Sequence, residues 1–212
     1  MAKISEEQIQ CAAQNSIPMT LHTYTLPHET EEYLDQVLGM FLSQFGQDEI
    51  KDTLAYCLRE LAVNAKKANT KRVYFEERGF DLDNRDDYET GMEGFKQDTL
   101  GNIDHYLQKQ KDAGLYIKVV FHAQGNSFRI SVRNNAEITK KEQIRIFDRI
   151  ARSRAFDSLE EAFSTVLDST EGAGIVILIL VLEKMGLDED AFNIESDPVS
   201  YTHLTLPPSD LV

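Results

Sequence analysis

The sequence predicts a single α/β domain, and three observations support this prediction. The chain has 212 residues, of which 42% are hydrophobic, and this is enough to bury one substantial core. Strand-like segments with alternating polarity stand beside segments with helical spacing. Two strand-like segments are separated by the turn residues Gly125 and Asn126, which favours an antiparallel hairpin.

The first elements expected along the chain are a strand and two helices. Residues 18–27 alternate apolar and polar positions as a half-buried strand does, and residues 28–46 follow helical spacing. Gly46 allows a break, and a second helix is expected to begin at Asp48. This helix should pack on a sheet, because it carries an apolar stripe made of Ile50, Leu54, Leu58, Leu61, Ala65 and Ala68.

Three further strands are expected in the middle of the chain. The composition of residues 71–77, 115–123 and 127–135 favours strands, and the last two should form the antiparallel hairpin. Residues 77–114 lie between the first and second of these strands. They are polar and charge-rich, with helical spacing in their second half, and we interpret them as a surface insertion.

Two short helices and one ambiguous segment follow the hairpin. Residues 139–153 and 157–170 have the pattern of helices. Residues 171–186 contain a β-branched run that favours a strand by propensity, whereas the preceding glycines and the length of the segment fit a buried helix. Periodicity leaves both alternatives open.

The end of the chain needs separate treatment. The ten residues "PVSYTHLTLP", beginning at Pro198, match the translation of a transposase adapter end used in shotgun sequencing libraries. We therefore predict that residues 198–212 are adapter-derived, that residues 1–197 form the domain, and that the natural chain continues past Asp197 with other sequence. The alternative is an ordinary closing strand with a proline-rich end.

Composition restricts the class of partner and the compartment. The net charge of −14 is spread along the chain, which disfavours broad contact with nucleic acid or anionic membrane but leaves room for a local basic site. The two cysteines, Cys11 and Cys57, fit no metal-binding spacing. No signal peptide or apolar run long enough to cross a bilayer is present. The expected location is the cytoplasm.

Glu60, Asn64 and Lys67 form a polar stripe on the second predicted helix. Their spacings of four and three place them on one side of the helix, next to its apolar stripe, where they would border the core and face a cleft. A carboxylate there could orient or deprotonate a water or hydroxyl, an amide oxygen could ligate Mg²⁺, and an ammonium could meet a phosphate oxygen. The alternative is a solvated helix edge.

The order of motifs resembles that of the GHKL ATPase superfamily of histidine kinases, gyrases, heat-shock chaperones and mismatch-repair ATPases. The stretch "ELAVNAKKA" is similar to its N box, and "VRNNAEI" (132–138) is similar to its first glycine box, V-x-D-N-G-x-G-I. The pair "IF" (146–147) resembles the phenylalanine box, and "EGAGIVI" resembles the second glycine box, G-x-G-L-G-L. The resemblance spans residues 16–196.

This resemblance implies a fold and a cofactor. The fold is a two-layer α/β sandwich of the Bergerat type, with a mixed, mostly antiparallel sheet and helices on one face. The cofactor is Mg-ATP. In the family the acid of the N box polarises the nucleophile, the asparagine holds the metal and the following basic residue contacts phosphate. These roles correspond here to Glu60, Asn64 and Lys67.

The first glycine box departs from the family pattern. The family has an aspartate that accepts a hydrogen bond from the adenine amino group, and Asn134 stands at that position. Ala136 replaces a glycine, and one residue fewer precedes Ile138. Asn134 remains an acceptor, but a neutral one, so adenine recognition should weaken by about 1 kcal/mol.

The second glycine box is also altered. Gly172 and Gly174 are retained, so backbone amides at a helix N-terminus could approach phosphate. Val176 replaces the third glycine and should restrict the closest approach. Asp168 and Glu171 would oppose a triphosphate if they faced it, or would cap the helix if they did not.

Residues 148–170, between the two boxes, correspond to the family's mobile lid. Arg149, Arg152 and Arg154 could reach phosphates when the lid closes, or could be solvated surface. His28 lacks the basic residue and proline that usually follow a phospho-accepting histidine, so self-phosphorylation is not expected.

Three functions follow from the resemblance. The first is a Mg-ATP-binding, histidine-kinase-like domain in cytosolic signal transduction. The second is an anti-sigma-type protein serine kinase, because the order strand, helix and N-box helix resembles that branch and no dimerisation helices precede it. The third is a regulatory module that binds nucleotide only to switch a partner surface. A regulatory protein partner is expected, nucleic acid is not, and a homodimer is left open.

Overall fold

We describe a computed structural model of the chain over residues 4–125, 127–153, 173–186, 192–197 and 199–206. The elements in chain order are α1 (Glu6–Gln14), β1 (Met19–Thr23), α2 (His28–Gln44), the short 3-10 helix η1 (Asp48–Ile50), α3 (Lys51–Arg78), α4 (Arg85–Gly101), α5 (Ile103–Asp112), β2 (Ile117–Gln124), β3 (Ser127–Asn134), α6 (Lys140–Ser153), α8 (Ala173–Lys184), β4 (Phe192–Asp197) and β5 (Val199–Leu206).

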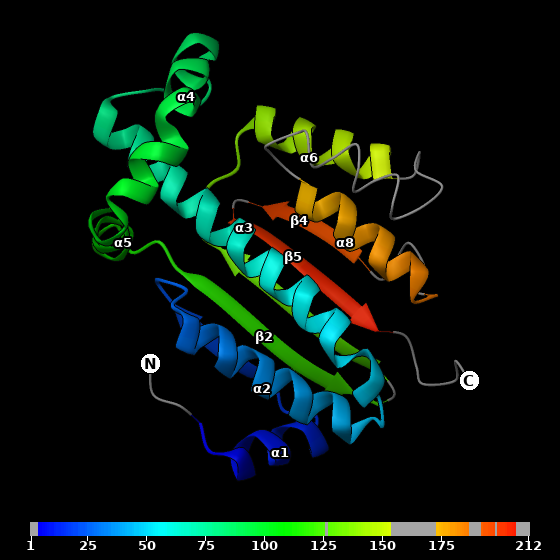
Figure 1. Cartoon of the computed structure of the whole chain (residues 1–212). Helices are drawn as coiled ribbons and strands as arrows, with labels where there is room; N and C mark the ends of the chain where they lie inside the picture. The colour runs from blue at the N-terminus through cyan, green and yellow to red at the C-terminus, as the bar shows by residue number, and fades with distance from the viewer. Residues whose placement is uncertain (1–3, 126, 154–172, 187–191, 198, 207–212) are drawn as a thin grey trace.

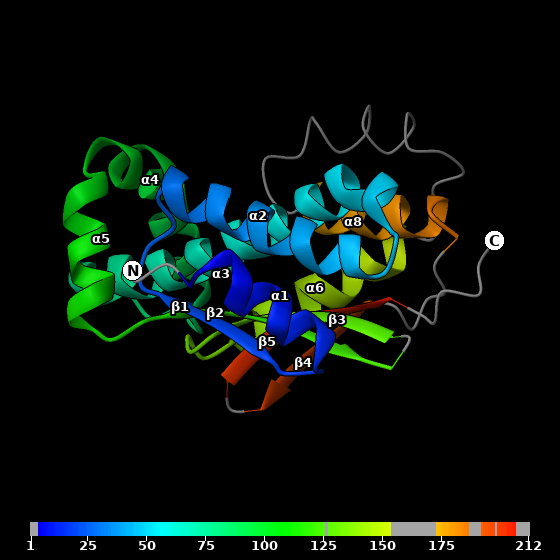
Figure 2. The same ribbon diagram turned by 90° about the horizontal axis from the view of Figure 1, so that it is seen from below.

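The strands form one antiparallel sheet with helices on one of its faces. The strand order is β1-β2-β3-β5-β4, and each neighbouring pair is antiparallel. Figure 2 shows α2, α3 and α8 above the same face of this sheet, with α1 beside α2 at the β1 edge. The mixture of helices and strands predicted for the domain, the antiparallel hairpin of β2 and β3, and the helices at 28–46 and 139–153 are therefore confirmed.

The main core lies between the sheet and this helical layer. Alternate residues of β2 and β3 are buried because they face the helices, as the period of two along a strand requires. Phe41 of α2 stacks on Phe121 and Phe128, with ring centroids 5.8 and 5.5 Å apart. These three side chains join α2 to the central hairpin.

The strand predicted at residues 71–77 is wrong, because these residues continue helix α3 to Arg78. Val73, Tyr74 and Phe75 have strand propensity, but in the helix all three are buried in a second hydrophobic cluster. Tertiary packing thus overrides local propensity. The helix ends at Gly79, whose φ of 68° is the left-handed conformation that glycine adopts at helix C-termini.

Residues 77–114 are helical over more of their length than expected. They contain the end of α3 and the two helices α4 and α5, which pack with the C-terminal part of α3 around the second cluster. Tyr88 of α4 and Tyr106 of α5 are buried there. In Figures 1 and 2 this group of helices lies beyond one end of the sheet.

The ambiguous segment at 171–186 is a helix where it is described. Residues 173–184 form α8, and Leu178 at its centre is fully buried. No helix in the described part of the chain is long and apolar enough to cross a membrane. The helix expected at 157–170 lies outside the described residues.

Strand β5 lies within the segment predicted to be adapter-derived. Its backbone pairs with β3 on one side and β4 on the other. The sequence "VSYTHLTL" contains several β-branched and aromatic residues, and such a composition favours a strand whatever its genetic origin. The adapter origin of residues 198–212 therefore stays a prediction.

Candidate functional site

The polar stripe lies on α3, beside the contact that this helix makes with α2. Arg59, the residue before Glu60, forms an ion pair with Asp35 of α2, with Nη2 2.8 Å from Oδ2. Successive helical residues point about 100° apart, so Glu60 points about 100° and Asn64 about 140° away from Arg59 around the helix axis. Figure 1 shows α8 on the flank of α3 opposite to α2. Asn64, which is rotated furthest from Arg59, is the stripe residue turned most towards that flank.

The three stripe residues make no side-chain hydrogen bond or ion pair with any residue that the structure describes. Glu60 and Asn64 are half-buried, and Lys67 is exposed. Elsewhere on α3, five ion pairs join charged side chains to neighbouring elements: Arg59–Asp35, Lys71–Glu142, Arg72–Glu142, Glu77–Lys109 and Arg78–Asp98. Glu60 and Asn64 thus combine partial burial with free hydrogen-bonding capacity.

Glu60 acts electrostatically on its helical neighbours. Burial raises the pKa of the Cys57 thiol to about 12, and the charge of Glu60 adds to this effect. Burial and then Glu60 also raise the pKa of Tyr56. Cys57 is therefore a neutral, buried thiol and a poor nucleophile. Within the described ranges, no cluster of three or more histidine, cysteine, aspartate or glutamate residues could hold a metal ion.

Asn134 lies at the end of β3, on the face of the sheet that is covered by helices. It is 6% exposed, and it follows the buried positions Ile130 and Val132 in the alternation of the strand. Its Nδ2 donates to Oδ1 of Asn69 on α3 over 3.1 Å. Asn69 is about one and a half helical turns beyond Asn64, so the first glycine-box position meets the same helix as the polar stripe.

The loop after β3 is fixed at several points. The Asn135 side chain accepts from Tyr116 N at 2.7 Å and donates to Gly114 O at 3.0 Å. Arg72 Nε donates to the carbonyl oxygen of Glu137 at 2.9 Å. Ala136, between these anchors, is 3% exposed. This loop is therefore held against both the start of β2 and helix α3.

Glu142 ties the start of α6 to α3. Its Oε1 lies 3.1 Å from Lys71 Nζ and 3.2 Å from Arg72 Nη1, and its Oε2 accepts from Thr139 N at 3.1 Å. Burial raises the pKa of this carboxyl, but the hydrogen bonds from Arg72 and the charges of Lys71 and Arg72 outweigh burial and lower the pKa to about 2. Glu142 is therefore ionised at any physiological pH.

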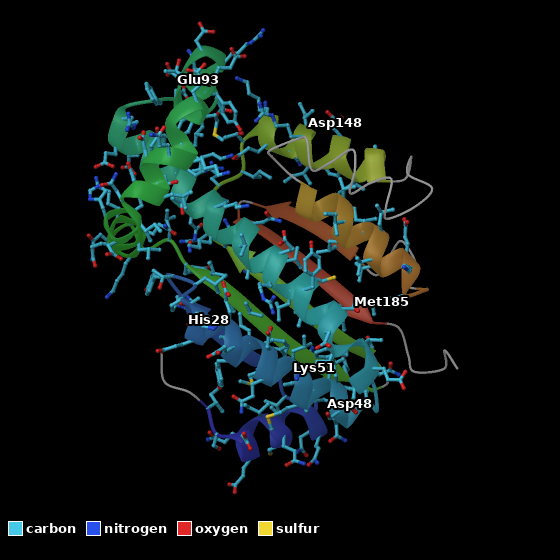
Figure 3. All side chains as sticks on the ribbon, viewed as in Figure 1. His28, Asp48, Lys51, Glu93, Asp148 and Met185 are labelled. Carbon is cyan, nitrogen blue, oxygen red and sulfur yellow. The ribbon has the colours of Figure 1, made fainter. Side chains whose placement is uncertain are left out.

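Helix α8 runs antiparallel to α3. Figure 3 shows Lys51, at the start of α3, and Met185, just after α8, at the same end of the helical layer. The N-terminus of α8 is thus directed towards the later turns of α3. Gly174 is the second residue of α8, where backbone N–H groups lack helical partners. Val176, at the position where the second glycine box of the GHKL superfamily has a glycine, is 4% exposed and buried among hydrophobic residues.

Several predicted residues lie outside the described part of the chain. Gly172, Asp168, Glu171 and Arg154 are among them. Arg149 and Arg152 belong to helix α6, but their side chains are outside the description. The lid expected at 148–170 is thus described only in its first residues, as the end of α6.

Sequence reasoning missed Asn69, Arg72 and Glu142. Asn69 had a visible signal, because an amide stands four residues after Ala65 on the apolar stripe of the helix. Arg72 was hidden by the expected strand at 71–77. Glu142 gave no signal of its own, since its partners lie about 70 positions earlier.

Comparisons with known proteins give one relative. An uncharacterized protein of Treponema pallidum (strain Nichols) is 44% identical over 193 residues, which make up 90% of this chain and 38% of that protein. The chain thus spans well under half the length of that relative. No family model matches the chain. No solved structure matches it either.

Proposed function

We propose that the chain is a Mg-ATP-binding domain of the GHKL type, with the Bergerat arrangement of sheet and helices, that serves signal transduction. The observation that carries the proposal is the pair Glu60 and Asn64 on α3, which is half-buried and unpartnered among the described residues. Their polar atoms are free to meet a bound ligand. The antiparallel sheet, covered by helices on one face, is compatible with this fold.

The residues of α3 have distinct roles in this proposal. Bound Mg-ATP would supply the phosphoryl group for transfer. Asn64 would ligate the metal through Oδ1, since amide oxygens are among the hard donors that Mg²⁺ accepts. Lys67 would neutralise a phosphate oxygen. Glu60 would orient the attacking hydroxyl or water and accept its proton.

The remaining contacts come from the other side of the proposed cleft. The N-terminus of α8 at Gly174 would direct its free N–H groups to phosphate. Asn134 would accept a hydrogen bond from the adenine amino group, and Ala136 would lie beside the base. A regulatory protein partner would read the nucleotide state.

Isothermal titration calorimetry with Mg-ATP tests this function. We expect saturable binding at submillimolar nucleotide. The absence of any binding heat at millimolar Mg-ATP would overturn the proposal.

A second candidate is a module that binds nucleotide without turnover. Two substitutions favour it: Asn134 lacks the charge of the family acid, and the buried side chain of Val176 stands where the family uses a glycine. Hydrolysis assays distinguish the two. Phosphate release that Glu60→Gln abolishes would exclude the second candidate.

A further inference from the structure

We infer that Asn69 is a positioning residue. It holds the side-chain amide of Asn134 in the orientation that leaves Oδ1 of Asn134 free, so that the site selects a 6-aminopurine over a 6-oxopurine. This inference rests on the proposed function, because it concerns the base specificity of the same site. Its basis is a relay of two hydrogen bonds, from Asn69 to Tyr116 O and from Asn134 to Asn69. The backbone carbonyl of Tyr116 determines which group donates and which accepts in this relay.

The relay begins at a backbone carbonyl. Tyr116 O can only accept, and Asn69 Nδ2 donates to it over 3.1 Å. Asn69 is fully buried, so rotating its amide would place Oδ1 against another acceptor with no water to intervene. The peptide that carries Tyr116 is itself held, because Tyr116 N donates to Asn135 Oδ1 over 2.7 Å.

The polarity then passes to Asn134. With Nδ2 of Asn69 committed to Tyr116, only Oδ1 of Asn69 remains for Asn134. Asn134 must therefore donate through Nδ2, as the 3.1 Å contact shows. None of the described residues donates to Oδ1 of Asn134, so this oxygen is the group left for a ligand.

An acceptor at this position discriminates between purines. The exocyclic group at C6 of adenine is an amino donor, whereas in hypoxanthine it is a carbonyl acceptor. Oδ1 of Asn134 pairs with the first and opposes the second. An asparagine free to rotate would accommodate both, because it carries a donor and an acceptor. Discrimination thus depends on Asn69 and not on Asn134 alone.

The test measures binding of Mg-ATP and of Mg-inosine triphosphate, which carries a carbonyl at C6, by calorimetry. We expect the wild-type chain to bind ATP about tenfold more tightly or better, since a mispaired buried polar group has this effect or a larger one. In Asn69→Leu the ratio of the two affinities should fall by about threefold or more, mainly because inosine triphosphate binds more tightly. A change in fold alone would weaken both nucleotides together.

Gln110→Leu is the matched control. Gln110 is fully buried on α5 and donates to Thr70 Oγ1 over 2.9 Å, but it does not contact Asn134. Its substitution removes a buried amide beside the relay and should leave the ATP preference unchanged. Equal wild-type affinities for the two nucleotides, or a preference that persists in Asn69→Leu, would overturn the inference while leaving the proposed function intact.

Asn134→Asp provides a second test in case Asn69→Leu does not fold. The change installs the acid of the family, but one carboxylate oxygen would face Asn69 Oδ1, which Tyr116 prevents from turning. We expect ATP binding to weaken about tenfold. Tighter ATP binding in this variant would contradict the relay. Absence of binding of either nucleotide to the wild-type chain would overturn the proposed function and this inference with it.

Discussion

Glu142 on α6 lies 3.2 Å from Arg72 on α3, measured between Oε1 and Nη1, although the two residues are 70 positions apart in the chain. Lys71 contacts the same carboxylate at 3.1 Å. All three side chains are largely buried. Because α6 begins just after the loop that follows β3, this ionic cluster holds that loop and α6 in a fixed relation to the helix that carries the polar stripe.

Glu142→Gln should therefore destabilise the fold. The change leaves two cations without their shared anion, and we expect a loss of about 3 kcal/mol at pH 7. The pKa of Glu142 is about 2 in the folded chain against an ordinary value of 4.5, so its stabilising effect is complete above about pH 4.5 and declines as the pH falls towards 2. The check is urea unfolding of wild type and variant at pH 7 and at pH 3.5. The difference between their free energies of unfolding should be smaller by about 1 kcal/mol at the lower pH.

Glu89→Gln is the control for this measurement. Glu89 pairs with Arg85 one helical turn away, and both side chains are mostly exposed. The expected loss is less than about 0.5 kcal/mol. Similar losses in the two variants would show that the cluster around Glu142 does not stabilise the fold.

Gly91 tests the packing of α4 on α3. A Cβ at this position would lie 2.6 Å from Phe75 Cζ, so Gly91→Ala should destabilise the fold by about 1–3 kcal/mol through overpacking. Gly101, at the end of the same helix, has no neighbouring atom within 4 Å of such a Cβ. Gly101→Ala should be neutral or slightly stabilising. Thermal unfolding of both variants checks this pair, and equal changes in Tm would contradict the position of Phe75.

The two cysteines should differ sharply in reactivity. Cys11 is exposed, whereas Cys57 is buried and its pKa is raised to about 12. Thiolate is the reactive form, so Ellman's reagent at pH 8 should titrate Cys11 alone in the folded chain. Both thiols should react after unfolding in urea. If both thiols react equally fast in the folded chain, Cys57 is not buried on α3 as described.

Glu60 should contribute to turnover more than to binding. Glu60→Gln retains the size of the side chain but cannot accept a proton, so we expect phosphate release to fall at least about 100-fold while ATP affinity changes little. Glu76→Gln, at an exposed position of the same helix, should retain wild-type turnover. Undiminished turnover in Glu60→Gln would show that Glu60 is not the base.

Periodicity predicted most of the elements that build the main core. The alternation in β2 and β3 and the apolar stripes of α2 and α3 were visible in the sequence, because one face of each element is buried. Helix α1 was not predicted. Its signal was a capping box, in which Ser5 and Gln8 bond to each other's backbone N–H groups.

The site could be predicted only in its local part. Glu60, Asn64 and Lys67 share a helix, so their spacing alone placed them on one side of it. The contacts of Asn69 with Asn134, and of Arg72 with Glu142, join residues about 65 and 70 positions apart. No local pattern encodes such pairs. They depend on how α3 crosses the sheet, and the erroneous strand at 71–77 removed Arg72 from that helix.

The affinity of the chain for ATP with and without Mg²⁺ tests the central claim most directly, when it is measured by calorimetry for the wild type and for Asn64→Ala. If Asn64 holds the metal, Mg²⁺ should increase the affinity of the wild-type chain at least about tenfold, and this increase should be largely lost in Asn64→Ala. An ATP affinity that is the same with and without Mg²⁺, or a magnesium effect that Asn64→Ala fully retains, would contradict the assignment of the polar stripe on α3 to a Mg-ATP site.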